Sequence, residues 1–392
     1  MRRLHIAFVI DTMEPFYRGG YERYAWEIAR RLAKQHDVWA FTSCSRDQVV
    51  EGVRFVSLCP QRGSFGTNGY RRPSSILRYI VGLLYQFRNG RHFDIVDCNA
   101  TPFLHVPIVA RLARFWGAKM VLTAHEALAH DLATYASERI AISRLRKPIA
   151  ALLSAVYRNA MGSAATIVCP SRLVAGDLER EGGRAVLPVL GGVDRVHTAK
   201  NEFHGRITFV GRLVVTKRVE MLIRAIAIAR AEGVVLALSV VGDGPQLAEL
   251  VELARTLGCT DCVTFWGQVA DQERTRILVQ ETDAYASASL REGISLATLE
   301  AMAAGNPAII SQGSGTLRNG AMEYVMPGLN GYVADGSAES IARAMADLAS
   351  LSPQQYEFLS RAAIDAAEEY TWNGATARTE EIMCHLAELE QE

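Results

Sequence analysis

Apolar and polar residues alternate along the chain as short apolar runs separated by longer amphipathic stretches. The run 6–10 is continuously apolar, as expected for a strand buried on both faces of a parallel sheet. The loop Gly19-Gly20 follows, and then a helical pattern that ends in a basic turn. Similar apolar runs recur at 37–41, 93–97, 119–123 and 165–169. Strands alternating with helices predict βαβ units in an open parallel sheet.

The same rhythm restarts after residue 200. Strands are expected at 206–210, 235–241, 263–266, 284–286 and 308–311, and helices near 219–231, 246–257, 272–279 and 295–304. The junction 190–204 is the least regular stretch. The pattern therefore predicts an α/β protein of two doubly wound domains, 1–196 and 197–373. The tail 374–392 is helical and acidic in pattern, and we expect it to pack back on the first domain.

Composition narrows the class of protein. The chain has 392 residues, of which 49% are hydrophobic and 21% charged, as in globular proteins of two or three domains. These values exclude disordered, collagen-like and disulfide-scaffold proteins. No apolar run approaches the length of a membrane span, and the run near the N-terminus is too short for a signal peptide. Seven cysteines, an odd number, favour a reducing compartment. We therefore expect a cytoplasmic protein.

The net charge of zero hides an imbalance between the halves. Residues 1–195 carry 27 basic and 16 acidic side chains, and residues 196–392 carry 15 basic and 26 acidic ones. The first half is therefore at +11 and the second at −11. An asymmetry of this size indicates two domains with different partners.

The basic excess surrounds two apolar segments, 76–87 and 149–156. The basic residues are Arg62, Arg71, Arg72, Arg78, Arg88 and Arg91 for the first, and Arg139, Arg144, Arg146, Lys147 and Arg158 for the second. Such a pattern is typical of contact with an anionic membrane surface. A lipid-linked acceptor would explain the same residues, and so would two core helices with solvated arginines. No nucleic-acid-reading module is recognisable, so no nucleic-acid partner is expected.

The segment 287–307 carries the most informative candidate chemistry. It predicts a strand, a loop, a helix and then a Gly-Asn-Pro stop. Glu300 is the only charged residue of an otherwise apolar helix, and a buried carboxylate needs partners. Glu292 lies beside Gly293, where backbone N–H groups at a helix start could bind an anion. Two carboxylates beside an anion site suit a ligand with phosphates and many hydroxyls. The alternative is that Glu292 favours the helix dipole and Glu300 meets a core arginine.

A second candidate follows the strand 206–210. Gly211 permits close backbone approach, Arg212 offers a fork for phosphate and Lys217 offers a point charge. The alternative is a set of ordinary solvated basic residues at the end of a strand. The remaining motifs do not indicate a site. The pair Cys259/Cys262 lacks the second pair of ligands that a zinc site needs. A nicotinamide dehydrogenase is disfavoured because the chain has no G-x-G-x-x-G fingerprint, and no P-loop is present either.

Taken in order, these motifs resemble the retaining glycosyltransferases called family 4, or "glycosyl transferases group 1". The pieces are Gly19-Gly20, His125, Gly192-Val193-Asp194, Gly211-Arg212-Leu213 with Lys217, the stretch 241–245, the stretch 263–269, and Glu292…Glu300 as E-x7-E. Each motif is weak alone, and their order and spacing carry the resemblance, which spans nearly the whole chain.

The resemblance implies a GT-B fold, in which two Rossmann-like domains face an interdomain cleft. By analogy, Glu300 binds the ribose of a nucleotide-sugar, Glu292 binds the donor sugar, and Arg212 and Lys217 hold the diphosphate. The remaining implied contacts to the donor come from Gly293, Ile294, Ser295, Leu296, Gly267 and Val269. His125 and the loop Gly19-Gly20 would face the reacting carbon from the first domain. Taken alone, His125 is more typical of a satisfied structural histidine, although it follows a strand where α/β sheets place ligands.

The implied reaction is metal-independent transfer, with retention, from a nucleotide-sugar to a polysaccharide, glycolipid or lipid-linked acceptor, at the inner face of the membrane. No Asp-x-Asp pair occurs in the chain, which fits an enzyme without a metal or other cofactor. The pattern departs from the family at Ser295, at Gly191 and in the extra residues 312–322 before Glu323. The alternative is a non-catalytic nucleotide-sugar-binding partner in a glycan-assembly system, whose extra residues close the acceptor side.

Overall fold

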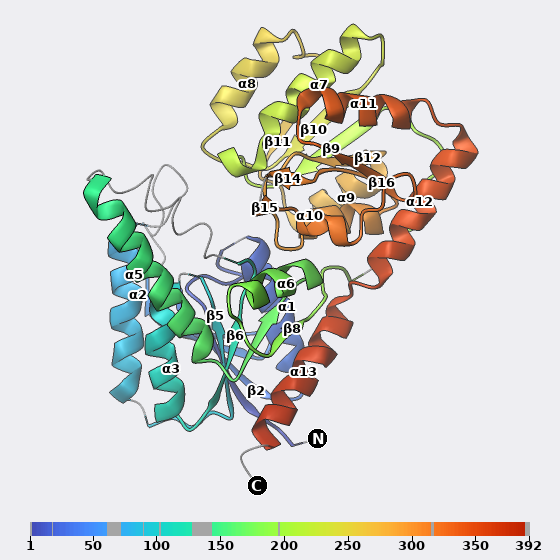
Figure 1. The fold of residues 1–392 in the computed structure, drawn as a ribbon. Helices are drawn as coiled ribbons and strands as arrows, with labels where there is room; N and C mark the ends of the chain where they lie inside the picture. The colour runs from blue at the N-terminus through green and yellow to red at the C-terminus, as the bar shows by residue number, and fades with distance from the viewer. Residues whose placement is uncertain are drawn as a thin grey trace. The chain divides into compact units, whose positions relative to one another are not determined.

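The computed structural model describes residues 2–17, 19–60, 72–88, 90–101, 103–127, 143–194, 197–314 and 317–388. The described chain forms two compact units, each built on its own sheet (Figure 1). Unit 1 extends to Gly191 and also takes the stretch from Trp372 onward, and unit 2 is Gly192–Thr371. The sequence pattern predicted the changes of domain at 196/197 and 373/374.

The sheet of unit 1 has the strand order β3-β4-β2-β1-β5-β6-β7-β8, and only β3 is antiparallel to its neighbour. The strands are β1 (His5–Val9), β2 (Asp37–Ser43), β3 (Gln48–Val50), β4 (Val53–Cys59), β5 (Ile95–Asn99), β6 (Lys119–Thr123), β7 (Thr166–Cys169) and β8 (Val186–Pro188). The helices are α1 (Gly20–Leu32), α2 (Pro73–Tyr85), α3 (Val106–Phe115), α5 (Ser143–Gly162), α6 (Arg172–Arg180) and α13 (Trp372–Glu388). Because β1 lies between β2 and β5, the strand order reverses beside β1, where open α/β sheets bind ligands.

Unit 2 has a six-stranded parallel sheet in the order β11-β10-β9-β12-β13-β16. The strands are β9 (Arg206–Val210), β10 (Ala237–Val241), β11 (Val263–Gly267), β12 (Ala284–Ser287), β13 (Ala308–Ser311) and β16 (Gly331–Ala334). The helices are α7 (Val219–Ala231), α8 (Leu247–Thr256), α9 (Asp271–Gln280), α10 (Leu296–Ala303), α11 (Ala338–Ala349) and α12 (Pro353–Glu368). The order reverses beside β9. Two Rossmann-like sheets with flanking helices confirm the predicted fold class.

The C-terminal helix α13 belongs to unit 1. Its first residue, Trp372, is buried and makes an edge contact with Tyr24 of α1, with ring centroids 5.7 Å apart. Farther along, Glu380 meets Nε2 of buried His36 at 3.0 Å. Since Nδ1 of His36 accepts the Leu4 N–H, Nε2 carries the proton and donates it to Glu380. None of the helices in the described ranges is long and apolar enough to cross a membrane.

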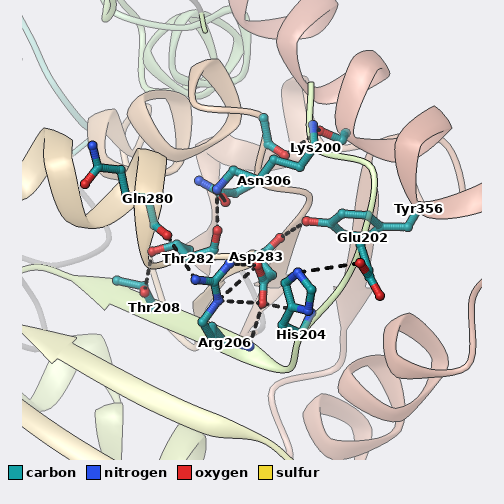
Figure 2. Close-up of polar contacts among 12 residues, drawn as sticks. Lys200, Glu202, His204, Arg206, Thr208, Gln280, Thr282, Asp283, Asn306 and Tyr356 are labelled. Atoms are coloured by element: carbon teal, nitrogen blue, oxygen red, sulfur yellow. Dashed lines mark hydrogen bonds and ion pairs between the residues drawn. The ribbon is translucent and has the colours of Figure 1, made fainter. Parts of the chain in front are cut away.

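The amino edge of the unit 2 sheet is closed by a polar network (Figure 2). The buried Asp283 carboxylate accepts the backbone N–H groups of His204 (3.0 Å) and Arg206 (2.9 Å), and the Arg206 guanidinium at 2.6 Å. The Lys200 ammonium donates to carbonyl oxygens of Leu278 and Thr282 and to Asn306 Oδ1. Every charged group of this network therefore has a close partner, as buried charges require.

Candidate functional site

The opposite, carboxyl edge of the unit 2 sheet gathers the loops that follow β9, β10 and β11. Gly211 N donates to Val241 O at 3.0 Å, and Gly242 N donates to Gly267 O at 2.8 Å. Gly242 has φ +146°, and a Cβ there would overlap the carbonyl oxygen of Gly211. Glycine is therefore required at position 242 for the close approach that fixes the loop after β9.

Arg212 lies in that fixed loop. Its side chain is exposed, and it has no hydrogen-bond or ion-pair partner within the described part of the chain. Leu213, the next residue, is fully buried, and its N–H donates to Asp243 O at 2.9 Å. The backbone on which Arg212 stands is thus anchored, while its guanidinium remains available to an anion.

Lys217 ends the short 3-10 helix η3 (Val215–Lys217) and forms an ion pair with Glu292. The loop after β12 is tied to η3 because Leu290 N donates to Thr216 O at 3.0 Å. The predicted phosphate-binding and sugar-binding side chains are thereby brought together. The Glu292 and Lys217 side chains are 14% and 25% exposed, so the pair faces outward only in part.

The extra residues 312–322 hold the turn at Glu292 in place. They contribute the hairpin β14 (Gly313–Ser314) and β15 (Leu317–Arg318) and the 3-10 helix η4 (Gly320–Glu323). Gly320 N donates to Glu292 O at 2.9 Å, and a Cβ on Gly320 would overlap the carbonyl oxygen of Gly293. Glu323, at the end of η4, accepts the Tyr370 hydroxyl at 3.4 Å. Residues 312–322 therefore support the turn that carries Glu292.

Helix α10 begins after Ser295, which adopts the left-handed conformation with φ +59°. The Ser295 hydroxyl bonds to Thr298 Oγ1 at 2.7 Å, and buried Tyr324 donates to the carbonyl oxygens of Ile294 (2.6 Å) and Ser295 (3.0 Å). These contacts fix the helix start that the resemblance assigns to donor binding. Leu296 packs toward Gly192, where a Cβ would come within 3.2 Å of its Cδ2.

Glu300 of α10 pairs with Arg274 of α9. Arg274 Nε lies 3.1 Å from Glu300 Oε2, and Nη2 lies 3.4 Å from Oε1. The sequence left open whether Glu300 serves a ligand or meets an arginine, and the structure supplies the arginine. The Glu300 and Arg274 side chains are 16% and 20% exposed, so the pair lies near the surface and not in the core.

Tyr285 of β12 is a buried neighbour of both carboxylates that sequence reasoning missed. Its hydroxyl donates to Val210 O at 3.3 Å. Burial raises the pKa of Tyr285, and the negative charges of Glu292 and Glu300 raise it further. A neutral phenol therefore lies beneath the two acids.

His125 follows β6 in unit 1 and lies among aromatic rings. Its ring centroid is 5.3 Å from that of Tyr24 and 5.7 Å from that of Tyr21. Burial lowers the pKa of His125 to about 3, so the imidazole is neutral at ordinary pH. Its Nε2 is buried and has no hydrogen-bond partner among the described residues. Within the described part of the chain, the ring nitrogen Nε2 of His125 is thus left without a structural partner.

The loop Gly19-Gly20 leads into α1. A Cβ on Gly19 would overlap the carboxylate of Glu22, whereas a Cβ on Gly20 would meet nothing within 4 Å. Glu22 is buried and accepts the Thr12 hydroxyl at 2.9 Å. The first turn of α1 thus already holds a carboxylate, so an anion there would meet negative charge. Sequence reasoning missed Glu22, although an acid at this position is a common helix-start signal.

A second buried acid lies in the sheet of unit 1. Asp97 of β5 accepts the Thr123 hydroxyl at 2.7 Å, and burial raises the pKa of Asp97 to about 7. It lines a cavity of about 10 Å³ together with Tyr24, Asn99 and Thr123. That space is roughly what a single water molecule needs.

The two basic clusters are only partly as predicted. Arg72, Arg78, Arg88, Lys147 and Arg158 are exposed, whereas Arg62, Arg71, Arg139 and the side chains of Arg144 and Arg146 lie outside the described residues. Arg91 was predicted to belong to the basic surface cluster, and the structure corrects this. Its guanidinium lies over the rings of Trp39 (4.9 Å) and Phe41 (5.6 Å), and the residue is half-buried. It packs against the core because these aromatic faces attract the cation.

Within the described residues, no three His, Cys, Asp or Glu side chains gather so that they could hold a metal ion. Cys259 and Cys262 are free thiols in the connection between α8 and β11.

Comparison with known proteins follows the same division of the chain. The protein-family model for Glycosyltransferase Family 4 matches residues 18–195. The protein-family model for Glycosyl transferases group 1 matches residues 193–365. A D-inositol 3-phosphate glycosyltransferase of Rhodococcus erythropolis is 36% identical over 167 residues, which are 39% of this chain and 38% of that protein. The GDP-mannose-dependent alpha-(1-6)-phosphatidylinositol dimannoside mannosyltransferase of Mycobacterium tuberculosis is 29% identical over 224 residues, 54% of this chain and 55% of that protein. The chain thus spans about half the length, or less, of these relatives.

Among solved structures, sucrose-phosphate synthase from Thermosynechococcus elongatus matches with a TM-score of 0.76 at 17% identity, over 98% of this chain and 99% of that one. This likeness concerns the fold. Together, the two adjoining family matches and the two Rossmann-like sheets identify the chain as a member of the group 1 glycosyltransferase family with a GT-B fold.

Proposed function

We propose that this chain transfers a sugar from a nucleotide-activated donor to a glycan or lipid-linked acceptor, with retention of configuration and without a metal ion. The observation that carries the proposal is Arg212, a cation on an anchored loop with no partner among the described residues. At the other edge of the same sheet, Lys200 and Arg206 have close partners. A cation kept available at the same edge of the sheet as Lys217 and Glu292 suits a phosphate-bearing, hydroxyl-rich ligand.

The reaction breaks the bond between the anomeric carbon and the donor phosphate oxygen and forms a bond to the acceptor oxygen. The acceptor proton leaves with the departing diphosphate. Arg212 and Lys217 stabilise the charge that develops on that diphosphate, as fixed positive groups do in other enzymes. Lys217 must exchange its present partner to do this, which frees Glu292 for the hydroxyls of the donor sugar.

The other site residues have binding roles. Glu300 accepts the ribose hydroxyls while Arg274 keeps its carboxylate oriented. Gly267 and Val269 line the base. The neutral His125 can meet a sugar hydroxyl through its buried Nε2 only after its surroundings move, and it cannot serve as a general acid because its pKa is lowered. Gly19 and Gly20 contact the acceptor side of the sugar, since Glu22 disfavours phosphate there.

The relatives suggest which compounds to test first. The M. tuberculosis protein is by its name GDP-mannose-dependent and acts on a phosphatidylinositol dimannoside. A GDP-hexose and a lipid-linked acceptor are therefore the first pair, with UDP-sugars next. We place the reaction at the inner face of the membrane, because exposed basic residues gather on unit 1.

The test is release of nucleoside diphosphate from a panel of nucleotide-sugars, with and without acceptor, for the natural protein and Glu292→Ala. We expect turnover with one donor and its loss in Glu292→Ala, while the nucleoside diphosphate still raises the melting temperature of the variant. NMR of the product's anomeric proton tests retention.

Two results would contradict the proposal. If no donor in the panel is turned over while nucleoside diphosphate binds, the chain is the non-catalytic binding partner that the sequence also allowed. If neither turnover nor diphosphate binding occurs, the Arg212 edge is not a donor site. Glu249→Gln on exposed α8 is the control for an acidic residue outside the site.

A further inference from the structure

The outward face of α2 is apolar. Leu77, Val81, Leu84 and Tyr85 are 62%, 58%, 50% and 59% exposed, and their spacing places them along one side of the helix. We refer to these four residues as the α2 stripe. It accounts for four large exposed apolar side chains in nine residues, so it is a continuous surface and not scattered single exposures.

The inward face of α2 is already filled. Tyr79 and Leu83 are buried in the core of unit 1. Gly82 lies so close to β4 that a Cβ there would overlap the carbonyl oxygen of Leu58. The helix cannot rotate to bury its stripe without displacing this contact. The α2 stripe therefore stays exposed when unit 1 is folded.

The charged residues of α2 and of the short segment that follows it are all basic. Arg78 and Arg88 are exposed beside it, and residues 72–88 contain no Asp or Glu. Helix α5, which like α2 packs on α3, also has no acidic residue and exposes Lys147, Arg158 and Leu152 (Figure 1).

Helix α8 of unit 2 provides the contrast. Its exposed positions carry Glu249, Glu252 and Arg255, and Val251 is 46% exposed among them. That is the usual mixed-charge surface of a helix that faces water. The α2 stripe combines the opposite properties, because it is apolar and flanked by a single sign of charge.

We propose that the α2 stripe docks on an anionic phospholipid bilayer, with the helix lying in the interface. Apolar side chains enter the acyl boundary, and Arg78, Arg88, Lys147 and Arg158 meet phosphate groups. A second copy of this chain is disfavoured as occupant, because it would bring arginines of like charge together. With 13 residues, α2 is too short to span a bilayer. The inference names the surface that delivers a lipid-linked acceptor and does not depend on sugar transfer.

The experiment is sedimentation of the full chain with phosphatidylcholine vesicles that contain or lack phosphatidylglycerol, over a range of salt concentrations and without donor. We expect binding to the anionic vesicles only, weakening as salt rises. The double variant Leu77→Glu/Val81→Glu should lower the partition coefficient by about 100-fold, roughly tenfold for each side chain. Val235→Glu, at a valine of unit 2 that is 90% exposed, should bind as the natural protein does.

Circular dichroism and melting temperature show whether the double variant is folded. Leu77→Ser/Val81→Ser, which adds no charge, should also weaken binding. Equal binding by this variant would overturn the role of the stripe, and equal binding to neutral vesicles would overturn the electrostatic part. No vesicle binding, or a dimer that Leu77→Glu dissociates, would also overturn the proposal. Because no donor is present, failure here leaves the proposed transfer reaction untouched.

Discussion

The charged residues at the two edges of the unit 2 sheet differ in how completely they are paired. At the amino edge, Asp283 is surrounded by donors and Lys200 by three oxygens, so both of these charges already have partners. At the carboxyl edge, Arg212 has no partner among the described residues, and the pairs of Glu292 and Glu300 are partly exposed. The comparison separates charges that hold the fold from charges that are available to a ligand, within one sheet.

The largest expected effect is on the amino edge. Asp283→Ala removes the carboxylate that pairs with the Arg206 guanidinium and leaves two backbone N–H groups without their acceptor, so we expect the free energy of unfolding to fall by about 3–5 kcal/mol. Urea denaturation measures this. Diphosphate binding by the fraction that remains folded should be unchanged, and a selective loss of binding would contradict the separation of the two edges.

The carboxyl edge should respond in the opposite way. We expect Glu292→Gln to lower kcat by on the order of 100-fold, because the donor sugar loses a charged acceptor, with a stability change within about 1 kcal/mol. Steady-state rates and urea denaturation together test both parts. Glu249→Gln should change neither value, and strong destabilisation by Glu292→Gln would make its ion pair with Lys217 structural.

Asp97 in unit 1 tests a third case, an acid that is buried without a cation. Its pKa of about 7 lies above the value near 3.9 of an unfolded chain, so the folded protein retains a proton that the unfolded chain releases. Stability should therefore fall as pH rises from about 4 to 7, by up to about 4 kcal/mol.

The variant Asp97→Asn isolates this effect. Its amide oxygen can still accept the Thr123 hydroxyl, and it has no proton to lose. Relative to the natural protein, it should gain stability progressively above about pH 4 and show a constant advantage above about pH 7. Urea denaturation across this range measures the difference, and a difference independent of pH would show that Asp97 is ionised in the fold.

Arg212 should give a smaller effect than Glu292, because Lys217 remains beside the phosphates. We expect Arg212→Ala to lower kcat/KM by about tenfold to 100-fold without changing the melting temperature, and Arg212→Lys to recover part of the loss. Isothermal titration with nucleoside diphosphate provides the matching affinities. A change in stability without a change in kcat/KM would remove Arg212 from the site.

The smallest expected effect concerns metal ions. If fixed side chains alone stabilise the departing diphosphate, incubation with EDTA and subsequent dialysis should leave the initial rate unchanged. Restoration of a lost rate by Mg²⁺ or Mn²⁺ would contradict the metal-free proposal.

Most strands of the two sheets could be predicted from the sequence, although β3, β4, β8 and β16 were missed. The predicted runs 119–123, 206–210 and 308–311 coincide with β6, β9 and β13, because parallel strands buried on both faces are continuously apolar. The candidate carboxylates and basic residues could also be identified from the sequence, because they lie in short motifs of neighbouring residues.

The partners of those residues could not be predicted. Arg274 lies 26 residues before Glu300 on another helix, and only the packing of α9 against α10 brings them together. Arg91 belonged to a basic cluster by sequence, yet it stacks on Trp39 because the fold places that ring beside it. The apolar outward face of α2 also escapes a periodicity argument, since a helical pattern does not say which side faces the sheet.

The contact between Gly320 and Gly293 has a consequence for protein engineering. A Cβ at position 320 would overlap the backbone of Gly293 unless one of the two segments moved. The segment after β13 and the turn that carries Glu292 are therefore packed directly against each other. A chimera that exchanges only one of the two segments with a relative would leave their surfaces mismatched. Residues 287–295 and 311–325 should therefore be transplanted, shortened or diversified together.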